Sequence, residues 1–118
     1  MTEVEALLRD AGRQFEPELQ NRLKGVFGGI FRSYLPQVWV FETEESTASL
    51  VVSATGAVSV VAGVAPHPDV TVKIPHDRLV AALRTGKKDQ VPPGPMNVTP
   101  HTPKGKTAFD YLRGRLGL

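Results

Sequence analysis

The chain contains no cysteine among its 118 residues, which excludes disulfide bonds, thiolate catalysis and cysteine zinc sites. No apolar run approaches the ~20 residues that span a bilayer, and residues 1–10 lack the basic and then apolar layout of a signal peptide. The sequence also lacks a large excess of positive or negative charge, since 14 basic and 12 acidic residues leave a net charge of +2. So weak a field does not favour nucleic acid. We therefore expect a cytoplasmic protein with no nucleic-acid partner.

Glycine and proline are plentiful, with 11 and 10 residues. The remaining composition, 41% hydrophobic and 22% charged, is typical of a globular protein. The length suits one domain over residues 1–118. Five prolines fall between residues 87 and 103, so this stretch is predicted to be a proline-rich loop with room for one short edge strand at 96–99.

Apolar residues at helical spacing predict four helices. A first helix over 2–12 ends at Gly12, and a second begins at Pro17 and ends before Pro36. The others are expected from His76 or Asp77 to residue 85, and over 104–116. Each glycine in a helix costs about 1 kcal/mol relative to alanine, so three glycines in the second helix indicate a break, a close backbone approach or room for a ligand. They are Gly25, Gly28 and Gly29.

Four segments rich in β-branched and aromatic residues predict strands. They are 38–41, 48–53, 57–64 and 70–74. The turn at 54–56 joins the second and third strands into a hairpin, and two prolines at 66 and 68 interrupt the ladder. The order of elements predicts an α+β fold, in which helices cover one face of a twisted, mainly antiparallel sheet of four to five strands.

One part of the chain carries a family resemblance. The sequence DVTVKIPHD over residues 69–77 is followed by Leu79, Leu83 and Gly86. An alternating strand that runs into a short helix ending in glycine is similar to the sterol carrier protein type 2 (SCP2) family, and the order of the upstream elements also matches. The chain departs from the family pattern at 96–103, where family members have a short basic strand ending in Gly-Asp.

The resemblance implies a sheet and helices that enclose an apolar tunnel for an acyl chain, a sterol or an acyl-CoA. Together with the apolar faces of the predicted helices, it gives ten candidate lining residues: Phe27, Ile30, Phe31, Tyr34, Leu79, Val80, Leu83, Met96, Phe109 and Leu112. The basic residues of the C-terminal third are candidates to meet an anionic head group. They are the four lysines Lys87, Lys88, Lys104 and Lys106, together with Arg113 and Arg115.

No catalytic centre, cofactor or metal site is expected. The three histidines, His67, His76 and His101, do not have the i, i+4 spacing of a helical metal pair. The serines of the predicted strands lack a nucleophile-elbow motif.

The sequence therefore predicts a non-catalytic protein that binds or carries an acyl chain or a sterol-like molecule. A second hypothesis keeps the fold but fills the tunnel, so that the protein is an interaction module or a homodimer. A cavity above roughly 300 Å³ favours the carrier. A third hypothesis is peripheral membrane association through residues 26–31.

Overall fold

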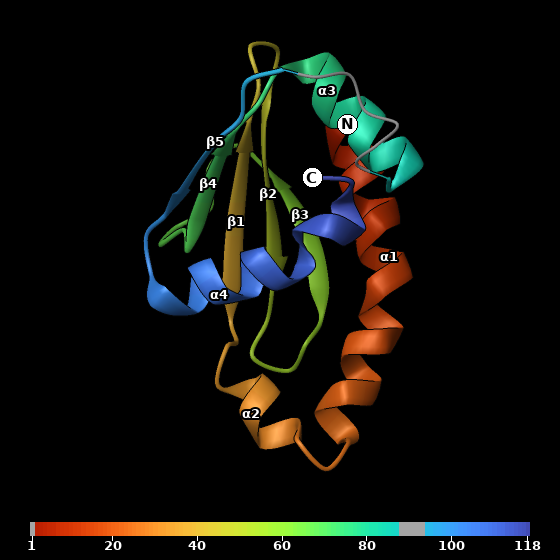
Figure 1. Cartoon of the computed structure of the whole chain (residues 1–118), viewed down its shortest axis with the longest axis vertical. Coiled ribbons are helices and arrows are strands. Elements are labelled where there is room, and N and C mark those ends of the chain that lie inside the picture. Colours follow the sequence, from red (N-terminus) through yellow and green to blue (C-terminus); the bar gives the residue numbers. More distant parts are fainter. Residues whose placement is uncertain (1, 88–93) are drawn as a thin grey trace.

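The computed structural model describes residues 2–87 and 94–118, and contains one five-stranded sheet and four α-helices in these ranges (Figure 1). The elements in chain order are α1 (Glu3–Lys24), α2 (Gly28–Arg32), β1 (Gln37–Glu42), β2 (Thr47–Val52), β3 (Val58–Ala62), β4 (Val70–Lys73), α3 (His76–Thr85), β5 (Asn97–Pro100), α4 (Pro103–Leu112) and the 3₁₀ helix η2 (Arg113–Leu116). The predicted α+β fold class is confirmed.

The sheet has the strand order β3-β2-β1-β4-β5, and only β1 and β4 pair in parallel. The chain reaches β4 by crossing the outer face of the sheet after β3. Ser49, on that face, donates a hydrogen bond to the carbonyl of Gly63 at 2.7 Å and accepts one from the N–H of Ala65 at 2.9 Å. This crossing covers Val40, which is buried although it faces away from the helices.

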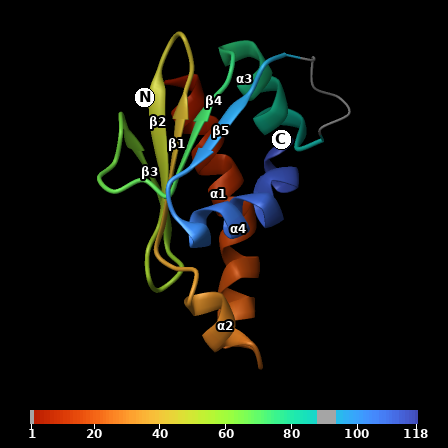
Figure 2. The ribbon, with the colours of Figure 1, turned by 60° about the vertical axis from the view of Figure 1, so that its left-hand side comes forward.

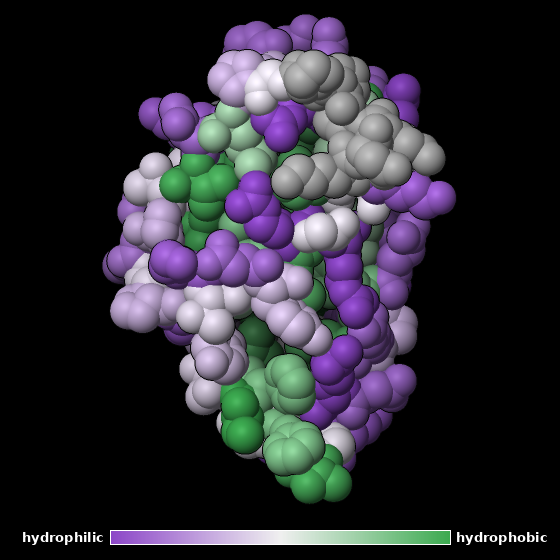
Figure 3. Space-filling view, viewed as in Figure 1, coloured by the Kyte–Doolittle hydropathy of each residue, from purple (hydrophilic) through white to green (hydrophobic). Residues whose placement is uncertain are grey.

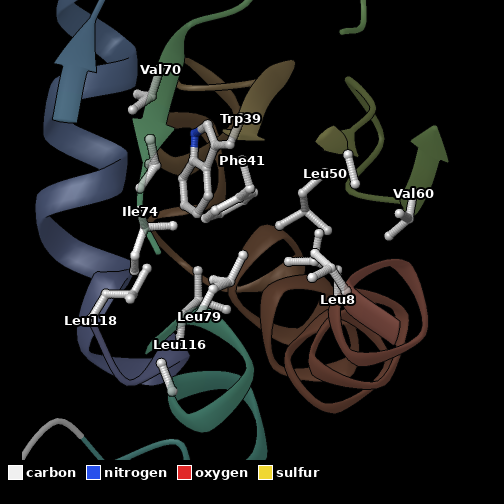
Figure 4. Packing of buried hydrophobic residues seen from close by; sticks show 14 of the residues in the cluster. Leu8, Trp39, Phe41, Leu50, Val60, Val70, Ile74, Leu79, Leu116 and Leu118 are labelled. Carbon is white, nitrogen blue, oxygen red and sulfur yellow. The ribbon is translucent and has the colours of Figure 1, made fainter. Parts of the chain in front are cut away.

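The helices lie on the opposite face (Figure 2). Every second side chain of a strand points to the same face of the sheet. Trp39, Phe41 and Leu50 lie on the face toward the helices and are buried there. They meet Leu8 from α1 and Leu79 from α3 in a continuous apolar core (Figure 4).

The helix boundaries differ from the prediction in the N-terminal third. The predicted end at Gly12 and restart at Pro17 are wrong, because α1 continues through both residues. Gly12 instead marks the close crossing of α1 over the sheet, since a Cβ there would lie 2.7 Å from Cγ1 of Val58. The predicted break does occur further on, at Gly25.

Gly28 explains why the chain can turn back so tightly after the break. A Cβ at Gly28 would lie 2.1 Å from the carbonyl oxygen of Leu23, so the two segments approach each other as backbone on backbone. The last predicted helix is in fact α4 followed by η2, and the predicted edge strand is β5. Among the residues that the structure describes, none of the helices is both long enough and apolar enough to cross a bilayer.

Candidate functional site: an apolar pocket between α1, α2, α4 and β1

An open pocket of about 230 Å³ lies between the second half of α1, the α2 segment, α4 and β1. Most of the surface around it belongs to apolar side chains. Its lining consists of Phe15, Glu18, Leu19, Arg22, Phe31, Tyr34, Leu35, Gln37, Trp39, Val52, Thr107, Ala108, Tyr111, Leu112 and Arg115. Figure 3 shows the recess between α1 and α4, where hydrophobic side chains form the floor.

The periodicities of helix and strand bring these residues together. In α1 the lining residues Phe15, Leu19 and Arg22 are spaced four and three apart, so they lie on one face of the helix. In β1, Gln37 and Trp39 are two residues apart, so both side chains lie on the face of the sheet that the helices cover. Trp39 is 3% exposed and packs edge-on against Phe109, with ring centroids 5.2 Å apart. Trp39 therefore separates the filled core from the pocket.

A buried carboxylate holds α4 in place over the sheet. Asp69 accepts hydrogen bonds from the N–H of Val38 at 2.9 Å and from the hydroxyl of Thr102 at 2.7 Å. The Thr102 hydroxyl in turn accepts from the N–H of Gly105 and caps α4. A Cβ at Gly105 would lie 2.5 Å from the carbonyl of Asp69, so glycine permits this close docking. The wall that α4 contributes to the pocket is thus fixed by polar contacts.

Three charged residues stand at the opening of the pocket, and we call them the charged rim: Glu18, Arg22 and Arg115. Glu18 accepts hydrogen bonds from Arg115 and, at 3.3 Å, from Arg22. The hydrogen bond from Arg115 is the main cause that lowers the pKa of the Glu18 carboxyl, and Arg22 adds to the effect. The rim therefore holds two cations and one anion and has a net charge of +1.

Aromatic rings fix one of these arginines. The Arg22 guanidinium lies 5.6 Å from the ring centroid of Phe31 and 5.9 Å from that of Tyr111. Both distances are within cation–π range. Arg22 thus links α1 with α2 and α4 across the opening, and its charge stays beside an apolar surface.

The structure distributes the ten candidate lining residues over three places. Phe31, Tyr34 and Leu112 line the pocket. Phe27 and Ile30 are exposed beyond it, at the end of the molecule. The other five belong to the apolar core or pack against it: Leu79, Val80, Leu83, Met96 and Phe109.

The four candidate head-group lysines do not line the pocket where the structure describes them, and Lys88 lies outside the described residues. Lys104 donates to the carbonyl of Pro36 at 2.6 Å, Lys106 pairs with Asp110 at 3.0 Å, and Lys87 is exposed after α3. Of the charged rim, Arg115 belongs to the basic group that the sequence offered for an anionic head group, whereas Glu18 and Arg22 were not predicted. The i, i+4 spacing of Glu18 and Arg22 was the available signal, but Arg115 is 97 residues away in the chain.

The two buried polar side chains of the pocket, Gln37 and Trp39, already have partners. The Gln37 amide donates to the carbonyls of Tyr34 and Lys104 and accepts from the Trp39 indole at 2.9 Å. Two of the histidines lie elsewhere: the His76 ring contacts Glu45, and the His101 ring contacts Thr71. No cluster of three or more potential metal ligands occurs among the described residues. The pocket is thus suited to apolar contact, with charge only at its opening.

Comparisons with family models, with curated proteins and with solved structures found no match. Function must therefore be inferred from the site's own geometry.

Proposed function

We propose that this protein is a non-catalytic cytoplasmic binder of a small anionic amphiphile, whose apolar tail enters the pocket and whose anionic head meets the charged rim. The observation that carries the proposal is the pocket itself, an apolar recess with an arginine pair at its opening. The resemblance to the SCP2 family points in the same direction, because lipid binding is what that family implies.

The volume limits the ligand. An apolar cavity of about 150 Å³ holds benzene, so about 230 Å³ suits on the order of nine carbon atoms. This is below the roughly 300 Å³ at which drug-sized ligand pockets begin. A medium-chain carboxylate such as decanoate fits better than a whole sterol or a long acyl chain.

The expected affinity is modest. Eight buried methylenes contribute about 6 kcal/mol of transfer free energy, and hydrogen bonds to a charged head add about 2 kcal/mol. Loss of translational and rotational freedom costs at least about 4 kcal/mol. The net of about 4 kcal/mol corresponds to a Kd on the order of 1 mM for decanoate.

The experiment uses Trp39, the only tryptophan of the chain, which lines the pocket. Titration with decanoate should change its fluorescence, and Ala108→Leu should abolish the change because the added side chain fills the pocket. Ala62→Leu is the matched control, because Ala62 is exposed on β3. A wild-type protein whose fluorescence and Tm both ignore decanoate at about 50 times the expected Kd would overturn the proposal.

The charged rim can be tested separately. Arg115→Gln should weaken decanoate binding about tenfold and leave decanol binding unchanged, since a bond to a charged group contributes roughly 1.5 kcal/mol or more. Glu18→Gln should strengthen decanoate binding, because it frees both arginines. Arg84→Gln, which breaks the Arg84–Glu3 pair between α3 and the far end of α1, is the control and should change neither affinity. Equal effects of Arg115→Gln on both ligands would argue against head-group recognition.

The small volume favours one further candidate, the interaction module, in which the pocket takes an apolar side chain from a second copy of this chain. Sedimentation equilibrium would then show self-association that Ala108→Leu weakens and Ala62→Leu leaves intact. A monomer at all concentrations would exclude this candidate.

A further inference from the structure

Three large apolar side chains project into solvent where α1 turns into α2, and we call them the apolar tip: Val26, Phe27 and Ile30. They are 96%, 65% and 59% exposed. The tip forms one end of the molecule, where it appears green in the space-filling view (Figures 1 and 3). Contiguous exposed apolar surface of this kind marks an interaction site.

The backbone beneath the tip is tied together by hydrogen bonds. The N–H of Gly28 donates to the carbonyl of Gly25 at 3.0 Å, and the carbonyl of Phe27 accepts from Ile30 and Phe31. Arg32 also reaches back and donates to the carbonyl of Leu23 at 3.0 Å. The side chains of the tip are therefore presented to solvent by a hydrogen-bonded turn.

The charges that flank the tip in the chain are basic, and Glu18, the nearest acidic residue before it, is paired with Arg22. From residue 19 to residue 41 the chain contains Arg22, Lys24 and Arg32 but no acidic residue. The neighbouring turn between β2 and β3, residues 53–57, has no charged residue, and it contacts α1 through a 3.0 Å hydrogen bond from Gln20 to the carbonyl of Thr55. The apolar tip thus projects from a basic surround.

We propose that the apolar tip docks this protein on an anionic phospholipid bilayer, with Val26, Phe27 and Ile30 inserted among the head groups and with Lys24 and Arg32 against the lipid phosphates. Apolar residues backed by basic ones are the pattern of interfacial membrane binding, in which insertion reaches about 5–10 Å. Each lysine or arginine near such a surface adds about 1 kcal/mol of attraction.

A protein partner fits this surface less well. A standard protein interface contains about 20–30 residues on each side and buries about 800 Å² per partner. Three convex side chains on a turn are far short of that size, whereas a bilayer surface deforms around them. The size and the charge of the surface both favour lipid.

Docking in this way has a consequence for the pocket. Phe31 lines the pocket and follows Ile30 of the tip directly, and its ring lies under Arg22 of the charged rim. The opening of the pocket would then lie close to the lipid surface. A ligand would then pass between the pocket and the membrane. This exchange rests on the proposed function, whereas docking itself does not.

The test is co-sedimentation of the whole protein with phosphatidylcholine vesicles, with and without phosphatidylglycerol. The wild type should bind the anionic vesicles. The triple variant Val26→Ser, Phe27→Ser, Ile30→Ser should lose at least about tenfold in partitioning, because its apolar area is removed. The matched control is Val61→Ser, Val64→Ser, which removes side chains that are 42% and 60% exposed elsewhere, and it should bind like the wild type.

Charge variants and salt sharpen the result. Lys24→Gln should weaken anionic binding about fivefold, whereas Lys106→Gln on α4 should not. Binding should fall as salt shortens the Debye length from about 10 Å at 0.1 M to about 3 Å at 1 M. Since all three tip side chains are exposed, the triple variant should keep the circular dichroism and the unfolding midpoint of the wild type.

Three results would overturn the proposal. The first is a wild type that does not bind anionic vesicles. The second is equal loss of binding in the tip variant and in the Val61, Val64 control. The third is a tip variant that binds vesicles normally but loses self-association in sedimentation equilibrium, since the tip would then be a protein contact. Ala108→Leu, with its pocket filled, should still dock, so failure of ligand binding and failure of docking are distinguishable.

Discussion

The two ends of the layer between α1 and the sheet differ in how they are filled. At one end the first half of α1 meets α3 and η2, and Leu8, Phe41 and Leu79 belong to one buried apolar cluster (Figure 4). At the other end the second half of α1 meets α2 and α4, and a pocket of about 230 Å³ remains open. The same helix and the same sheet therefore build a filled apolar core and an open apolar pocket. The hollow of about 360 Å³ on the surface between α1, α3 and η2 is lined mostly by polar surface and does not open the core.

The covering elements account for this difference. The closed end receives large inward side chains from a ten-residue α3 and from Leu116 of η2. The open end is covered by a five-residue α2 that begins with two glycines, and the wall opposite contributes the small residues Ala108 and Thr107. Interior packing normally leaves no void of this size. The comparison indicates that the closed end stabilises the fold, whereas the open end is left free for binding.

The largest expected effect comes from truncating one leucine at each end of the same helix. Leu8→Ala removes a fully buried side chain and should lower the free energy of unfolding by about 3 kcal/mol, which includes the cost of the new cavity. Leu19→Ala removes a half-buried pocket side chain and should cost about 1 kcal/mol, because the site is already open. Urea unfolding measures both values. Equal losses would mean that the pocket is packed in solution, and the contrast between the two ends would fail.

The next effect tests the turn that separates the ends, at two neighbouring glycines. Gly28→Ala should lower stability by more than about 1 kcal/mol, because its Cβ would collide with the backbone of Leu23. Gly29→Ala should raise stability by about 0.5–1 kcal/mol, since nothing lies within 4 Å of its Cβ and alanine favours helix. Thermal unfolding compares the two variants. A Gly28→Ala protein as stable as Gly29→Ala would contradict the close approach between α1 and α2.

Sequence analysis predicted the sheet well because its signal is local. Strand periodicity and the turn at 54–56 each act within a few residues, as does the glycine signal at Gly86 that correctly ends α3. It misplaced the helix ends at Gly12 and Pro17 because the reason for glycine at position 12 is tertiary: α1 crosses Val58 there. A local stop signal and a close helix crossing are indistinguishable in the sequence.

The site was harder to predict than the fold. Apolar residues on one helix face give the same sequence pattern whether they fill a core, as Leu79 does, or line a pocket, as Leu112 does. The difference depends on which opposing side chains are large enough to fill the space, and these come from distant segments. The charged rim shows the same limit, because its strongest contact joins Glu18 in α1 to Arg115 in η2.

The smallest effect concerns the ion pairs that bridge the open end. Because Arg115, and then Arg22, lower the pKa of Glu18 below its ordinary value, the folded state holds this proton less tightly than the unfolded chain. The stabilising contribution of Glu18 is therefore complete above the ordinary value of 4.5 and is lost as the pH falls through the lowered pKa. The difference in unfolding free energy between the wild type and Glu18→Gln should shrink over that range, and urea titrations at a series of pH values measure it. In an Arg115→Gln background the same difference should be smaller at neutral pH, where Glu18 is ionised, because the main partner is gone. A difference that ignores both pH and Arg115 would show that the open end is held by its apolar walls and by the Asp69 contacts of α4 alone, and that the charged rim contributes only to binding.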